Sequence, residues 1–131
     1  MNIPGVVRIG SCYYDVEFTN DTLTVDGREV MGVIEYYNHV IRIKMGMGDV
    51  QQQEQTFLHE LVHGITRDRG IELGDQEEII VDKIAKGLHQ VILDNPRMFI
   101  TEKEIEFEGE GEEEWIYQEQ ELNQILEDLK N

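Results

Sequence analysis

The sequence has few features that would direct it to an oxidising compartment or into a membrane. Cys12 is the single cysteine, so the chain cannot form an internal disulfide, and nothing indicates export. No stretch, residues 1–10 included, has the long uncharged apolar run of a signal peptide or a membrane helix. We therefore expect a cytoplasmic protein that does not enter a membrane.

Basic residues are scarce. The 131 residues include 11 Lys and Arg against 28 Asp and Glu, for a net charge of −17. Binding nucleic acid through its phosphates requires clustered Lys and Arg, so this composition argues against a nucleic-acid partner. The acidic excess is uneven, because residues 101–131 hold 12 acidic and 2 basic side chains. We expect one domain at residues 1–100, followed by an acidic C-terminal extension at residues 101–131.

The first fifty residues predict short strands separated by turns. Apolar and polar residues alternate in several short segments between residues 6 and 44. Between two of these segments, Asp26-Gly27 favours a tight reversal of the chain. The segments predict a small antiparallel meander.

Helical spacing replaces this alternation after the glycines at 46 and 48. Asp49 is placed to cap a helix that extends to about Arg69, and an apolar stripe along it is wide enough to pack on a sheet. A second helix is predicted from about Asp75 to Asp94 and ends before Pro96. Its predicted buried residues are Ile80, Val81, Ile84, Leu88, Val91 and Ile92. The expected fold class is α+β, with the N-terminal sheet packed on these two helices.

The acidic extension has its own pattern. Residues 103–107 alternate as a strand with one wet face would, and the acidic run at residues 110–114 is typical of a solvated linker. Leu122, Ile125, Leu126 and Leu129 recur at helical spacing and predict a short amphipathic helix.

The segment His59-Glu60-Leu61-Val62-His63 indicates a metal-binding site. Histidines four residues apart on a helix project from one face, so both imidazoles can bind one ion. Glu60 points to a neighbouring sector, where it can reach a metal-bound water as a general base without coordinating the metal. The alternative is that these are ordinary helix residues.

A catalytic zinc usually has three protein ligands, so the two histidines require a third ligand from elsewhere in the chain. A carboxylate on the following helix is one known arrangement, and Glu78 is chosen over Glu77, which is turned to another sector. Asp82, one turn further on, is predicted to accept a hydrogen bond from the outer nitrogen of a ligand histidine. The alternative for Glu78 is a capping box in which it folds back on Asp75.

The two other histidines, His39 and His89, are not predicted to be metal ligands. His89 lies 11 residues beyond Glu78, about 16 Å along a helix, and is interpreted as a surface or packing residue. His39, in a predicted turn, is either a donor to the transition state or simply solvated.

The segment from His59 to His63, followed by Glu78 and Asp82 four residues apart on the next helix, resembles the gluzincin zinc peptidases. The resemblance is closest to the compact ImmA/IrrE-like metallopeptidases, many of them carried by phages and mobile elements. The resemblance covers roughly residues 5–95 and implies a minigluzincin-like fold. It also implies Zn²⁺ held by His59, His63 and Glu78, and peptide-bond hydrolysis with Glu60 as general base. The expected setting is the cytoplasm of a bacterium or of a phage-infected host.

The same resemblance implies a peptide or protein substrate lying along the strand at residues 40–44. The sequence assigns no tyrosine or histidine to stabilise the transition state. The alternative function is a non-catalytic, zinc-stabilised interaction protein that binds a basic partner through its acidic tail. The tail could also act as a linker or as a restraint over the site.

Overall fold

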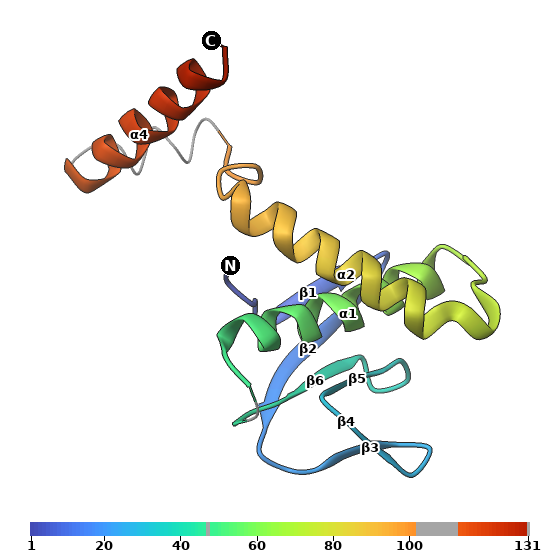
Figure 1. The fold of residues 1–131 in the computed structure, drawn as a ribbon. Coiled ribbons are helices and arrows are strands. Elements are labelled where there is room, and N and C mark those ends of the chain that lie inside the picture. The colour runs from blue at the N-terminus through green and yellow to red at the C-terminus, as the bar shows by residue number, and fades with distance from the viewer. Residues whose placement is uncertain (47, 102–112, 131) are drawn as a thin grey trace. The chain divides into compact units, whose positions relative to one another are not determined.

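The computed structural model describes residues 1–46, 48–101 and 113–130, with the backbone alone at 113–121. The chain forms two compact units, Met1–Pro96 and Arg97–Asn131. The first is an α+β unit that carries the predicted metal-binding motif (Figure 1). None of the helices in the described part of the chain is long and apolar enough to cross a membrane.

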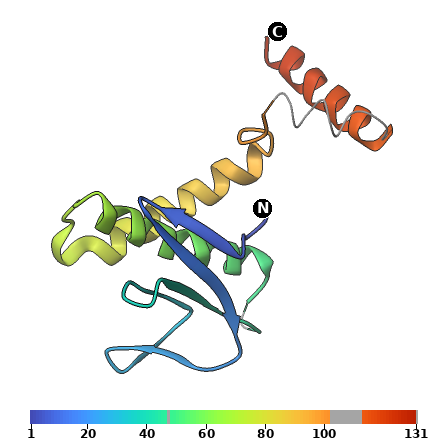
Figure 2. The same ribbon diagram turned by 180° about the vertical axis from the view of Figure 1, so that it is seen from behind.

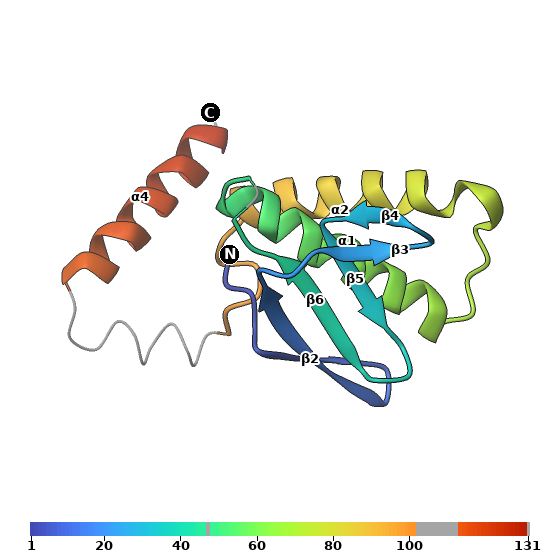
Figure 3. The ribbon, with the colours of Figure 1, turned by 90° about the horizontal axis from the view of Figure 1, so that it is seen from below.

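A four-stranded sheet forms one layer of the first unit (Figure 3). Its order is β1-β2-β6-β5, where β1 is Val6–Ile9, β2 is Cys12–Thr19, β6 is Val40–Lys44 and β5 is Gly32–Glu35. β2 and β6 pair in parallel and the other two pairs are antiparallel. The prediction of a wholly antiparallel meander is therefore wrong.

The parallel pair arises because a separate hairpin follows β2. Strands β3 (Leu23–Val25) and β4 (Arg28–Val30) pair with each other in a sheet of their own. Asp26 and Gly27 join them with φ values of 51° and 77°, as a two-residue reversal requires. After this excursion β5 reverses into β6, and β6 runs beside β2 in the same direction.

Helix α1 (Val50–Asp68) lies between the sheet and helix α2 (Glu77–Asp94), as the views from the front and from behind agree (Figures 1 and 2). Asp49 caps α1 as predicted, accepting a hydrogen bond of 2.9 Å from the amide of Gln52. Gly64 lets the helix approach the sheet, since a Cβ there would lie 2.6 Å from Ile9 Cδ1. The sheet, α1 and α2 all contribute to the buried core, which comprises Ile9, Tyr14, Val16, Ile41, Ile43, Phe57, Leu58 and Ala85.

The buried face of α2 differs from the prediction. Val81, Ala85 and His89 are buried, and Ile84, Leu88 and Val91 are exposed. An apolar pattern alone cannot tell which of two adjoining stripes meets the neighbouring helix, and here the buried stripe includes a polar residue. The short 3₁₀ helix η1 (Gly74–Gln76) precedes α2, so regular α-helix begins at Glu77.

His89 is a packing residue and not a surface one. The residue is 3% exposed, and its Nε2 lies 2.8 Å from an oxygen of Glu54 on α1, a residue that is 4% exposed. The other Glu54 oxygen accepts a hydrogen bond of 3.1 Å from the Met1 amino group. Burial raises the pKa of Glu54, but the hydrogen bonds from His89 and the amino group outweigh it, and the pKa lies below its usual value. The contact between His89 and Glu54 links α2 to α1.

Removing one partner of this pair is expected to destabilise the fold. Glu54→Ala should lower the free energy of unfolding near neutral pH by about 3 kcal/mol, because it leaves a buried partner uncompensated. Denaturant unfolding of wild type, Glu54→Ala and the exposed control Glu72→Ala measures this. Since the folded-state pKa of Glu54 is depressed, its contribution is present above the unfolded value of 4.5 and disappears as pH falls through the folded value. An equal penalty at neutral and strongly acid pH would contradict the ionic interpretation.

In the second unit, α4 spans Glu113–Lys130 and confirms the predicted C-terminal helix, with an earlier start. Ile125, Leu126 and Leu129 are exposed large apolar side chains on it. The strand predicted at residues 103–107 falls outside the described residues.

Candidate metal centre

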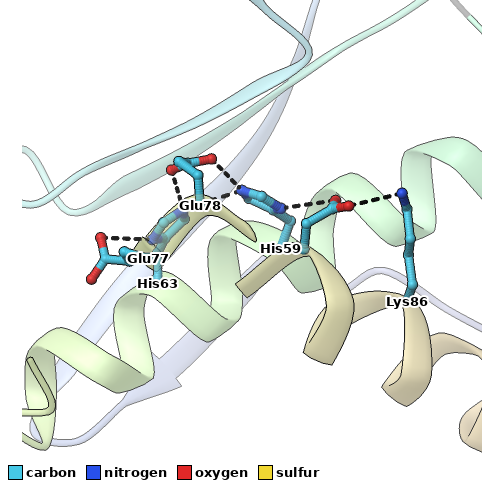
Figure 4. A network of polar contacts seen from close by, with 6 residues as sticks. His59, His63, Glu77, Glu78 and Lys86 are labelled. Atoms are coloured by element: carbon cyan, nitrogen blue, oxygen red, sulfur yellow. Dashed lines mark hydrogen bonds and ion pairs between the residues drawn. The ribbon is translucent and has the colours of Figure 1, made fainter. Parts of the chain in front are cut away.

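Helix α1 brings the two motif histidines together. His59 and His63 lie one turn apart, with their Nε2 atoms separated by 3.1 Å. Both rings project toward the N-terminal end of α2 (Figure 4). His63 is buried, and His59 lies partly exposed at the rim.

Glu78, in the first turn of α2, completes the cluster. One of its carboxylate oxygens lies 3.2 Å from His59 Nε2 and the other 2.7 Å from His63 Nε2. The alternative capping box is not formed, since Asp75 lies within η1 and the N-cap of α2 is Gln76, with no side-chain cap. The carboxylate of Glu78 is therefore directed at the two imidazoles.

The spacing of these atoms suits a small divalent ion. His59, His63 and Glu78 each offer a ligand atom, all within 4.8 Å of one another, and the group could hold a metal ion. Tetrahedral zinc with bonds of about 2.0–2.1 Å separates its ligand atoms by about 3.4 Å, close to the 2.7–3.2 Å found here. Two imidazoles and one carboxylate are also a donor set that catalytic zinc uses.

Each histidine has a carboxylate at its outer nitrogen, Nδ1. An oxygen of Asp82 lies 3.5 Å from His59 Nδ1, the partner that the sequence predicted, and Lys86 lies 2.8 Å from the other Asp82 oxygen. An oxygen of Glu77 lies 3.3 Å from His63 Nδ1 (Figure 4). Such partners fix the tautomer of a histidine and direct its opposite nitrogen toward a metal.

Sequence reasoning placed Glu77 in another sector and missed this role. The error comes from treating Glu77 as an interior position of a helix beginning at Asp75, whereas it is the first residue of α2. Two ligand histidines have two outer nitrogens to satisfy, and that requirement was the signal for a second carboxylate.

Glu60 lies next to His59 on α1 and is 7% exposed. Burial, then the negative charge of Glu78, raise its pKa to about 7, while a hydrogen bond from the backbone of Ile34 acts in the opposite direction. A divalent cation held by Glu78 would offset the second cause and favour the carboxylate. A buried carboxylate poised in this way can accept a proton near neutral pH.

The open edge of the sheet lies beside Glu60. β5 is an edge strand, with β6 as its single neighbour among the described strands. The backbone amide of Lys44 donates a hydrogen bond of 2.8 Å to the Met31 carbonyl. By the alternation of an antiparallel pair, Gly32 and Ile34 therefore turn their main-chain groups away from β6. Gly32 also permits close approach to α1, because a Cβ there would lie 2.5 Å from Thr56 Cγ2.

This topology corrects the expected position of an extended substrate. The strand at residues 40–44 is β6, which is paired on both sides, with β2 and with β5. A peptide that adds to the sheet beside Glu60 can do so at β5.

Comparison of the chain with known protein families, with curated proteins and with solved structures gives no match. The remaining histidines lie away from the cluster. His39 is exposed in the turn before β6, with its ring centroid 5.3 Å from that of Tyr14, and His89 belongs to the Glu54 pair. In the part of the chain that the structure describes, His59, His63 and Glu78 form the one group suited to an ion.

Proposed function

We propose that this protein is a zinc-dependent peptidase of the gluzincin type, similar to the compact ImmA/IrrE-like enzymes. The observation that carries the proposal is the convergence of His59, His63 and Glu78 at ligand spacing, with Glu60 buried directly beside His59. The outer carboxylates of Asp82 and Glu77 support it, since metal-binding histidines are commonly held this way.

Zinc at this cluster would supply a water of lowered pKa and a positive charge for the substrate carbonyl. Glu60 would accept a proton from the attacking water and would return it to the leaving amine as the C–N bond breaks, so a single carboxyl group would serve both halves of the hydrolysis. The main-chain groups of Gly32 and the carbonyl of Ile34 would hold an extended peptide by hydrogen bonds, while the Ile34 amide donates to Glu60. This arrangement would place a carbonyl of the peptide next to Glu60.

Metal removal tests the proposal. Purified protein should contain one zinc ion per chain and should cleave members of a proteome-derived peptide library, with products identified by mass spectrometry. Chelation should abolish both zinc content and cleavage, and added Zn²⁺ should restore them. A chain that takes up no metal, or cleavage that persists without metal, would contradict the proposal.

The acidic, apolar-faced helix α4 favours the alternative function, an interaction protein that zinc stabilises. The same experiment separates the two. Stoichiometric zinc without cleavage of any peptide in the library would favour the interaction protein.

A further inference from the structure

Arg67 lies on the same face of α1 as the catalytic residues. It follows His63 by four residues and Glu60 by seven, so these three side chains form one row along the helix. At 1.5 Å per residue, Arg67 lies about 10 Å along the axis from Glu60. An extended peptide covers that length with about three residues.

The guanidinium of Arg67 is held by Tyr36, with its Cζ 4.1 Å from the ring centroid. Tyr36 directly follows the edge strand β5 and packs partly buried against the core. Burial raises the pKa of Tyr36 to about 12, although Arg67 acts to lower it, so the ring is neutral at physiological pH. The cation is thus fixed beside the end of the strand along which the substrate is proposed to lie.

Within the described part of the chain, Arg67 differs from Arg42 and Arg69 in having no carboxylate partner. Arg42 forms ion pairs with Glu17 and Glu35, and Arg69 lies 3.5 Å from an oxygen of Asp68. Among residues 1–46, 48–101 and 122–130, Arg67 forms no ion pair, and its side chain is exposed. Its planar fork of N–H donors, suited to a carboxylate, is therefore available to a ligand.

We infer that Arg67 is a specificity-determining residue, which binds a substrate carboxylate two to four residues from the scissile bond. This inference rests on the proposed peptidase function. The carboxylate is either that of an Asp or Glu side chain or that of the substrate's C-terminus. Because Glu77, Glu78 and Asp82 surround the histidines, Arg67 gives this acidic site a point of attraction for a negative group.

The test uses the zinc-loaded protein and the cleavage sites found in a proteome-derived peptide library. The expected result is enrichment of Asp, Glu or a chain end at one position two to four residues from the cleaved bond. For a matched pair of synthetic peptides with Asp or Asn there, Asp should give about tenfold higher kcat/KM, mainly through KM. Amidated peptides with an internal Asp separate the side chain from the terminal carboxylate.

Charge reversal supplies the control. Arg67→Glu should remove the preference for Asp over Asn and favour Lys at that position, while Arg67→Lys should retain part of the preference. Arg69→Glu makes the same charge change two residues away and should leave the preference intact. A purely structural Arg67 at the end of α1 would change stability without altering which peptide is preferred.

The experiment distinguishes failure of the role inferred for Arg67 from failure of the proposed peptidase function. Metal-dependent cleavage that is indifferent to acidic groups at every position, or a preference unchanged in Arg67→Glu, would overturn this inference and leave the peptidase standing. Absence of cleavage by zinc-loaded wild type would overturn the peptidase function, and this inference with it.

Discussion

Glu60→Gln is expected to lower kcat/KM for peptide hydrolysis by roughly 10²–10⁴-fold, the usual contribution of a general base. Glutamine has the shape of glutamate and can still accept the hydrogen bond from the Ile34 backbone, but its amide cannot take a proton from water. Zinc affinity should remain unchanged, because Glu60 is not among the three ligands.

The measurement is kcat/KM on a peptide identified from the library, together with zinc content and unfolding temperature of the same preparation. Glu72→Gln, in the exposed loop before η1, makes the same chemical change away from the site and should retain wild-type activity. If Glu60→Gln still hydrolyses peptides at the wild-type rate, Glu60 is not the base. If it loses zinc as well as activity, Glu60 acts on the metal and not on the water.

The helices were predictable from local signals. Asp49 begins α1 by capping it, and the proline at 96 follows the end of α2, because caps and breakers act within a turn of their own position. The same holds for the reversal at Asp26-Gly27. These elements are specified by residues a few positions apart.

The sheet was not predictable in the same way. The parallel pairing of β2 with β6 joins residues 25 apart, Asp15 with Val40 for example, and depends on an intervening hairpin that leaves the sheet. Alternation of apolar and polar residues identifies strands but says nothing about which strand lies beside which. The position of the free edge, and so of the expected substrate, followed from the pairing and could not be read before it.

The prediction of which face of α2 is buried was wrong for a related reason. The pattern counted apolar residues, whereas the burial of His89 follows from a polar partner, Glu54, on another helix. With His89 inside, Val81 and Ala85 meet α1, and the stripe containing Ile84 remains exposed. That rotation also directs Glu78 and Asp82 at His59.

Most of the candidate metal site could be predicted from the sequence, because two histidines four residues apart come together wherever the segment forms a helix. Glu78 and Asp82 were placed by their spacing on the next helix, and the structure brings both to the histidines. The contact of Glu77 with His63 depended on where α2 begins, a boundary that shifted when η1 took residues 74–76. Tyr36 and Arg67 lie 31 residues apart in the sequence, and no local pattern connects them.

Glu78→Ala tests the metal centre apart from catalysis. It removes one of three ligands and should weaken zinc binding by more than the roughly 10–100-fold expected when an outer hydrogen-bond partner is lost. Glu77→Ala and Asp82→Ala each remove such an outer partner and should fall within that smaller range.

Competition of each variant with a zinc-chelating dye measures the affinities without requiring activity, and Glu72→Ala provides the matched control. The order expected is wild type and Glu72→Ala tightest, the two outer-carboxylate variants weaker, and Glu78→Ala weakest. Undiminished affinity in Glu78→Ala would remove it from the ligand set. A larger loss in Glu77→Ala than in Glu78→Ala would mean that the adjacent carboxylate binds the ion, since both lie within 3.3 Å of a His63 nitrogen.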